Sequence, residues 1–252
     1  MSFREGRSPI SQHSPAVAYR LHKPGMTLTA FPPLPHATLA WASAAFIATG
    51  LAVGLPAADA AARIAILHAP AAWLSSGLYV AMALLGACAL AWRHRVAALL
   101  ANAIAPTGIV FTLVALWTQA LLRKPVHGLW WVWDAEAVSQ LMLMFLFGGV
   151  LALRAMIDDP RRADRAAALL ALVGAGNLPV LYFSVYWWHV LSHEAAASSA
   201  SGWTARTAGA AALVLAGFIA YAVFAVSKRA RCTADEYRVL AHSTIEFQEV
   251  KP

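Results

Sequence analysis

Charged residues are scarce in this chain of 252 residues, where they make up 12% of the sequence. A typical soluble domain carries about a quarter. Hydrophobic residues account for 60%, and the mean hydropathy is +0.61. This small number of polar side chains cannot cover a protein surface in water. The composition therefore excludes an ordinary soluble domain and indicates a protein embedded in lipid.

Cysteine is nearly absent as well, with Cys88 and Cys232 as its two occurrences. They form no CxxC or CxxCH motif, so neither redox exchange nor covalent attachment of a cofactor to this chain is indicated. We interpret Cys88 as a packing residue and Cys232 as a residue of the polar tail.

An early apolar stretch is the third feature that the sequence lacks. Residues 1–36 contain 4 basic residues together with several Ser and Pro. A secretory signal would place an apolar core close to its start. We therefore expect residues 1–36 to be a polar extension in the cytoplasm.

Long apolar runs, by contrast, are abundant. Runs of about 20 residues cross a bilayer, and uniform runs without alternation predict helices, which satisfy their own backbone groups in lipid. We expect an all-α integral membrane protein with six transmembrane helices in residues 37–226 and a cytoplasmic tail at 227–252. The six runs are Ala37–Pro56, Ala71–Trp92, Val96–Leu121, Val138–Met156, Ala166–Tyr186 and Thr207–Val226.

The basic residues indicate the orientation, because Lys and Arg concentrate on the cytoplasmic side. One side of the expected bundle, which includes both ends of the chain, collects 15 of them and the other side 4. Both termini are therefore expected in the cytoplasm. The net charge of +7 is accordingly a topology signal, not a sign of nucleic-acid binding. The outer loops are expected at about 57–70, 122–137 and 187–206.

Tryptophan gathers on the outer side. Of the ten tryptophans, the six in expected outer loops are Trp130, Trp131, Trp133, Trp187, Trp188 and Trp203. An interfacial aromatic belt is one explanation, although belts form at both membrane faces. A platform for a large, flat, apolar ligand is the other, because each indole can bury a large apolar area. The tryptophans alone leave both explanations open.

Histidine favours the platform. The outer loops and their edges contain His68, His127, His189 and His193. Imidazole, with an ordinary pKa near ~6.5, is largely neutral outside the cytoplasm and free to coordinate iron. Two imidazoles on opposite sides of a porphyrin, with indoles against its face, form a coherent haem site. Zinc is the competing metal, but the compact ligand spacing of a closed zinc site is missing from the sequence.

Three charged residues flank the tryptophan cluster. Asp134 is suited to cap the following helix, since Asp is favoured at N-caps, and it could also orient the loop by accepting a bond from an indole or backbone N–H. Arg123 and Lys124 are unusual as outer cations. They would meet lipid headgroups or the two propionates of a haem.

The residues also resemble a known family. The stretch HGLWWVWDAEAVSQLMLMFL is similar to the tryptophan-rich signature of haem-handling proteins, which usually reads close to WGTWWVWD. Together with ILHAPAAW, IAPTGIVFT and GNLPVLYFSVYWW, it resembles the haem exporter protein C (CcmC) family of cytochrome c maturation. The similarity follows nearly all six runs in order.

This resemblance implies a protein of the bacterial inner membrane that binds haem b non-covalently on the periplasmic side, without catalytic turnover. It implies delivery of the haem to the chaperone CcmE, alongside CcmD and the ATP-binding-cassette pair CcmA and CcmB. His68 falls on the first axial-ligand position. The residues that fall on the platform are Trp130, Trp131, Trp133 and Asp134, with Trp187 and Trp188 from the later pair.

The second ligand position departs from the family pattern. The family has WWxxLH, whereas this chain reads WWHVLSH, with Ser192 at the expected position and His193 one residue further on. We choose His193, with His189 next. His127 stands where the family generally has tryptophan, as a passive replacement or a third available imidazole.

Two other functions remain as alternatives. The tryptophan signature also fits the larger cytochrome c haem lyases, enzymes that join haem to CxxCH chains. A secondary transporter is the third hypothesis, but the apolar runs contain almost no ionisable residues and show no inverted repeat. Association with CcmE favours haem delivery, and association with apocytochrome c favours the lyase.

Overall fold

The computed structural model describes residues 36–92, 94–180, 183 and 204–249, and the regular elements in these ranges are all helices. The chain divides into two compact units, Pro35–Arg231 and a second unit of Met1–Leu34 with Cys232–Pro252. The elements are α2 (His36–Gly54), the short 3-10 helix η2 (Leu55–Ala57), α3 (Ala60–Trp92), α4 (Arg95–His127), α5 (Ala135–Met156), α6 (Pro160–Gly174) and α9 (Ala205–Glu249).

Five of these helices, namely α2, α3, α4, α5 and α9, are long and apolar enough to cross a membrane. They correspond to five of the six predicted spans. The remaining run, Ala166–Tyr186, is not one continuous helix where it is described, because α6 ends at Gly174 and a turn follows at Ala175 and Gly176. This run continues beyond the described residues, so the sixth span stays a prediction.

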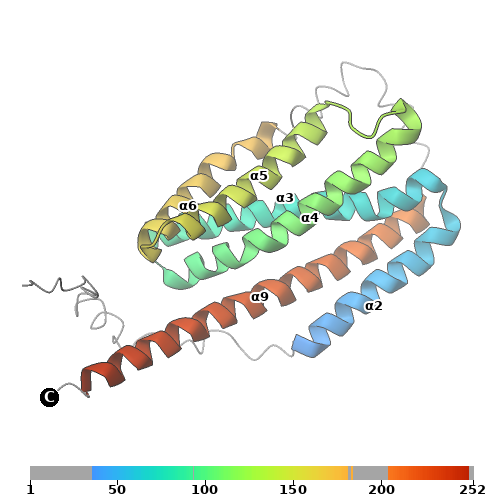
Figure 1. Ribbon diagram of the computed structural model, residues 1–252. Helices are drawn as coiled ribbons and strands as arrows, with labels where there is room; N and C mark the ends of the chain where they lie inside the picture. Colours follow the sequence, from blue (N-terminus) through green and yellow to red (C-terminus); the bar gives the residue numbers. More distant parts are fainter. Residues whose placement is uncertain (1–35, 93, 181–182, 184–203, 250–252) are drawn as a thin grey trace, which may run out of the picture. The chain divides into compact units, whose positions relative to one another are not determined.

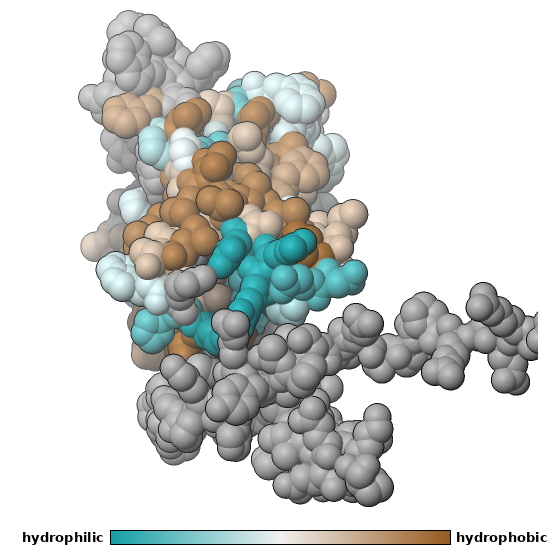
Figure 2. Space-filling model, turned by 90° about the vertical axis from the view of Figure 1, so that its left-hand side faces the viewer, coloured by the Kyte–Doolittle hydropathy of each residue, from teal (hydrophilic) through white to brown (hydrophobic). Residues whose placement is uncertain are grey.

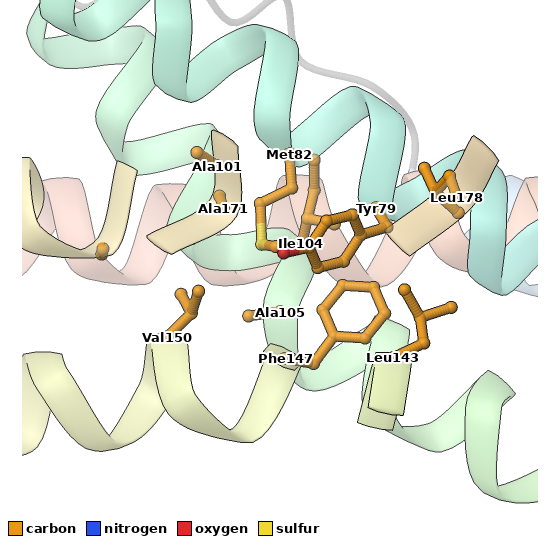
Figure 3. Packing of buried hydrophobic residues seen from close by; sticks show 11 residues of the cluster. Tyr79, Met82, Ala101, Ile104, Ala105, Leu143, Phe147, Val150, Ala171 and Leu178 are labelled. Carbon is orange, nitrogen blue, oxygen red and sulfur yellow. The ribbon is translucent and has the colours of Figure 1, made fainter. Parts of the chain in front are cut away.

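Helices α3, α4, α5 and α6 pack together around the main hydrophobic core (Figure 1). At its centre the rings of Tyr79 and Phe147 meet edge to face, with centroids 5.1 Å apart and planes at 75°. Met82, Ile104 and Leu143 pack around them (Figure 3). The two rings and Met82 are at most 1% exposed, so this part of the bundle is fully buried.

Two glycines allow the close approach of these helices. A side chain at Gly108 of α4 would collide with the ring of Phe147, and one at Gly174 would collide with the hydroxyl of Tyr79. Small residues at such positions let neighbouring helices approach closely in a membrane. The aromatic pair is thus seated in spaces that the glycines leave open.

Helices α2 and α9 lie side by side and antiparallel (Figure 1). Added Cβ atoms would stand 2.8 Å from the Ala210 carbonyl at Gly50 and 2.6 Å from Ile47 at Gly217. Further along α9, Phe218 meets Phe111 of α4 with centroids 5.0 Å apart. The antiparallel order puts the first residues of α2 and the residues of α9 near Arg231 at the same end of the first unit.

Charged side chains gather at the end where α5 leads into α6. Figure 2 faces this end and shows a hydrophilic patch beside a hydrophobic band. Asp164 accepts hydrogen bonds from Arg154 at 2.6 Å and from the Asn102 amide at 3.0 Å, which tie α4, α5 and α6 together. Arg161 and Arg165 are exposed. The arginines of this patch belong to the set that predicts the cytoplasmic side.

Several helices are longer than expected. The predicted outer loop at 57–70 is mostly helix, because Asp59 caps α3 through the Ala62 N–H at 2.7 Å and the alanine-rich stretch that follows favours helix. The predicted loop at 122–137 shrinks to Gly128–Asp134, because α4 reaches His127 and α5 begins at Ala135. Helix α9 likewise runs through the expected tail as far as Glu249.

Candidate functional site

His68 lies within α3, two turns from its start, and not in a loop as expected. Its Nδ1 is 3.1 Å from the carbonyl oxygen of Ala115 and 3.1 Å from the hydroxyl of Thr118, both on α4. A carbonyl can only accept, and the Thr118 hydroxyl already donates to the Val114 carbonyl at 2.7 Å. Nδ1 must therefore carry a hydrogen, and in the neutral ring Nε2 then keeps its lone pair.

Glu136 stands at that second nitrogen. Its Oε1 is 3.5 Å from Nε2 of His68, and its Oε2 is 3.4 Å from Nη2 of Arg123. The same guanidinium also forms an ion pair with Asp134. Three helices thus contribute to one polar network, with His68 from α3, Arg123 from α4, and Glu136 with its neighbour Asp134 at the start of α5.

Asp134 has the capping role that the sequence predicts. It is the N-cap of α5, and its Oδ1 accepts from the Ala137 N–H at 2.8 Å. Its other carboxylate oxygen pairs with Arg123, so the partner is a guanidinium and not the indole that we considered. Arg123 itself, expected to meet headgroups or propionates, is engaged by these two carboxylates.

The tryptophan-rich loop begins where α4 ends. Gly128 has a φ of 71°, in the left-handed region that favours glycine, and its N–H bonds the Lys124 carbonyl at 2.9 Å. Trp131 and Trp133 then pack edge to face, with centroids 5.5 Å apart. Trp133 is 77% exposed and Trp130 is 51% exposed. The loop therefore presents apolar indole surface next to the polar network.

Lys124 occupies one face of that surface. Its ammonium lies 3.7 Å from the centroid of the Trp130 ring, a cation–π contact. A flat ligand that stacks on this face of Trp130 has to displace the lysine.

The remaining predicted site residues divide into two groups. His127 is the last residue of α4 and is exposed. The others lie outside the described residues, so their assignments stay predictions; these are Trp187, Trp188, His189 and His193.

Buried amides below the network were missed by the sequence analysis. Gln119 of α4 and Gln140 of α5 are 4% and 2% exposed. Within the described part of the chain, both amide atoms of Gln119 and the Oε1 of Gln140 have no hydrogen-bond partner. Nearby in α5, Ser139 accepts from the Asn177 amide through its carbonyl at 3.2 Å. Uncharged polar groups at membrane depth carry no sequence motif, and only their burial reveals them.

Glu136 was missed for a different reason. It follows Asp134 by two residues, in the first turn of a helix, where an acid is already explained by the helix dipole. Only the packing of α3 against α5 brings it to His68. The site therefore joins an imidazole with one committed nitrogen, an ion-paired network around Arg123 and a set of exposed indoles, which suits a ligand that is flat and apolar.

The chain is similar to known proteins of one family. The family described as heme exporter protein C matches residues 18–244. The heme exporter protein C of Escherichia coli (strain K12) is 48% identical over 129 residues, which are 51% of this chain and 53% of that protein. The one of Haemophilus influenzae is 42% identical over 134 residues, 53% of this chain and 54% of that protein.

The matched region thus spans about half the length of these two relatives. The match to heme exporter protein C of Bradyrhizobium diazoefficiens is longer, at 41% identity over 182 residues, 69% of each chain. The family match covers most of the sequence. The resemblance inferred from the tryptophan-rich stretch is confirmed, and this chain belongs to the heme exporter protein C family.

Proposed function

We propose that this protein binds haem at its outer, periplasmic end and delivers it to the haem chaperone CcmE for cytochrome c maturation. The observation that carries the proposal is the hydrogen bonding of the His68 ring. Its Nδ1–H is held by the Ala115 carbonyl and the Thr118 hydroxyl, so Nε2 is the nitrogen left for iron. Metal-bound histidines characteristically donate their other ring N–H in this way, which fixes the tautomer and the ring orientation.

The surroundings of His68 fit haem as the cargo. The exposed indoles of Trp130 and Trp133 offer apolar area to the macrocycle. His193 is our choice for the second axial ligand, with His189 and His127 as alternatives. Haem b would be held without a covalent bond to this chain.

The family suggests the cellular setting. We propose a multi-pass protein of the bacterial inner membrane that works with CcmD, CcmA and CcmB and hands haem to CcmE. Its role is delivery, without catalytic turnover of its own. Co-purification of haem-loaded protein with CcmE would support this role, whereas direct capture of apocytochrome c would point to a lyase.

The visible absorption spectrum of the purified full-length protein tests the ligands. We expect the low-spin spectrum of two imidazoles on iron. Replacing His68 or His193 with Ala should shift it towards high spin or release the haem, because one face of the iron loses its ligand. His189→Ala is the matched control and should leave the spectrum unchanged.

The outcomes discriminate between the assignments. If His189→Ala or His127→Ala alters the spectrum and His193→Ala does not, the second ligand is misassigned. If none of the histidine variants has an effect, the bis-histidine site is refuted.

The proposed orientation has its own test. A reporter enzyme that is active only in the periplasm, fused after Pro252, should be inactive, because the basic residues predict a cytoplasmic C-terminus. An active fusion would contradict the proposed topology, in which six spans leave both termini in the cytoplasm.

A further inference from the structure

Glu136 lies beside the nitrogen of His68 that iron would bind. Its Oε1 is 3.5 Å from Nε2, the nitrogen that the Ala115 and Thr118 contacts leave uncommitted. With a neutral ring, Nε2 and the carboxylate oxygen are both acceptors, so no hydrogen bond joins them. The contact therefore does little to hold the carboxylate at the nitrogen.

Arg123 is one group that holds Glu136 there. Its guanidinium Nη2 is 3.4 Å from Oε2 of Glu136, and it also pairs with Asp134 at the base of the tryptophan-rich loop. The side chains of Glu136 and Arg123 are 34% and 30% exposed, so both can rotate without opening the core. Oε2 of Glu136 is thus held by Arg123, whereas Oε1 only lies near Nε2 of His68.

Iron coordination and this arrangement conflict. A metal–imidazole bond is only about 2 Å long, so the centre of the macrocycle must come very close to Nε2. A carboxylate oxygen 3.5 Å from the same atom stands in space that the ring system needs. Haem can bind His68 only if Glu136 moves away.

Resting on the haem-binding function proposed above, we propose that Glu136 is a positioning residue that covers Nε2 of His68 in the haem-free protein. When haem arrives, Glu136 swings away from Nε2 and keeps its ion pair with Arg123. The protein thereby holds its haem less tightly than His68 alone would allow. Weaker holding suits a protein that has to pass its cargo on.

Haemin titration of the purified, haem-free, full-length protein tests this proposal. Glu136→Ala should bind haemin more tightly by roughly three- to tenfold, the scale of one polar contact, because no side chain at this position then reaches Nε2. Glu136→Asp keeps the charge but is one methylene shorter and cannot reach the nitrogen, so it should also tighten binding. Both variants should keep the low-spin spectrum.

Two controls separate this effect from a general loss of negative charge. Asp158→Asn removes an exposed acid at the opposite end of the bundle and should leave haemin affinity unchanged. In a His68→Ala background, Glu136→Ala should lose its effect, because it acts through His68. An electrostatic effect on the haem carboxylates would survive in that background and would be absent in Glu136→Asp.

The outcomes keep the two proposals apart. If the unchanged protein shows no His68-dependent haemin spectrum, the proposed function fails. If it shows one, but Glu136→Asp binds no more tightly than the unchanged protein, the covering role is wrong, and this second variant decides the matter should Glu136→Ala not fold. An effect of Glu136→Ala that persists without His68 would equally refute it.

Discussion

Helices α3 and α5 meet at two levels that differ sharply in chemistry. At the outer level His68 faces Glu136, and eleven residues further along each helix Tyr79 faces Phe147. Eleven residues correspond to about 16 Å along a helix. The same two helices, in the same register, thus form a polar contact at one level and an edge-to-face aromatic contact at the other.

The difference indicates that the aromatic level is the rigid part of the bundle and that the polar level is the part that can rearrange. Tyr79 and Phe147 are both 0% exposed, and glycines on α4 and α6 leave room for them. Glu136 is 34% exposed and is held by an ion pair that can exchange partners. The buried aromatic level fixes the spacing of the helices, and the polar level can therefore rearrange around a ligand without loss of the fold.

The largest predicted effect comes from a substitution that disrupts the aromatic level. In Gly108→Ala the new methyl group would collide with the ring of Phe147, so we expect the free energy of unfolding to fall by about 1–3 kcal/mol, as for other overpacked cores. Thermal unfolding in detergent, followed by circular dichroism, measures this change. Protein that remains folded should keep the spectrum of its bound haem.

Gly148→Ala is the matched control, because no atom lies within 4 Å of a Cβ at that position of α5. It should leave the unfolding temperature unchanged or raise it slightly, since alanine favours helix over glycine. Equal losses of stability at Gly108 and Gly148 would mean that the helix spacing does not depend on the Phe147 contact.

The sequence predicts the aromatic level only in part. Apolar runs and basic residues are sufficient to place α2, α3, α4, α5 and α9, because length and hydrophobicity alone decide which segments suit a bilayer. They do not predict that Tyr79 faces Phe147, because lipid-facing and core-facing residues are equally apolar in such a helix. The early start of α3 at Ala60 was also missed, since Arg63 and the proline at position 70 resemble a loop.

The sequence predicts the outer level better, and for chemical reasons. His68, Asp134 and the tryptophans stand out against an apolar background, and their residue types suggest haem. The sequence could not predict how they are joined, because Arg123 and Glu136 come together through the ends of separate helices. A charge has several chemically equivalent partners in a sequence, and only the helix register selects one of them.

The second prediction breaks the polar level without touching the core. Asp134→Ala removes both the N-cap of α5 and the ion pair with Arg123, and should lower stability by about 0.5–2 kcal/mol, the usual range for a lost cap. Asp134→Asn keeps a capping oxygen and should recover most of this loss. Thermal unfolding compares the two, and an Asn variant as unstable as the Ala variant would show that the ion pair, and not the cap, is what stabilises the start of α5.

The third and smallest effect concerns access to the indole platform. Lys124 lies 3.7 Å above the Trp130 ring, and an exposed cation–π contact is worth about 0.5–1 kcal/mol. If haem stacks on that face, it must displace the lysine. Lys124→Ala should then tighten haemin binding by roughly two- to fivefold, the equivalent of the same contact energy.

Lys124→Arg supplies the control, because a guanidinium also stacks on an indole and should keep the affinity of the unchanged protein. Titration with haemin under the same conditions allows the haemin affinities of the Lys124 and Glu136 variants to be compared directly. Weaker binding by Lys124→Ala would show that the ammonium pairs with a haem carboxylate, as Arg123 pairs with Asp134 and Glu136. In that case Glu136 alone would restrain haem at the outer level, and the lysine would belong with the groups that attract it.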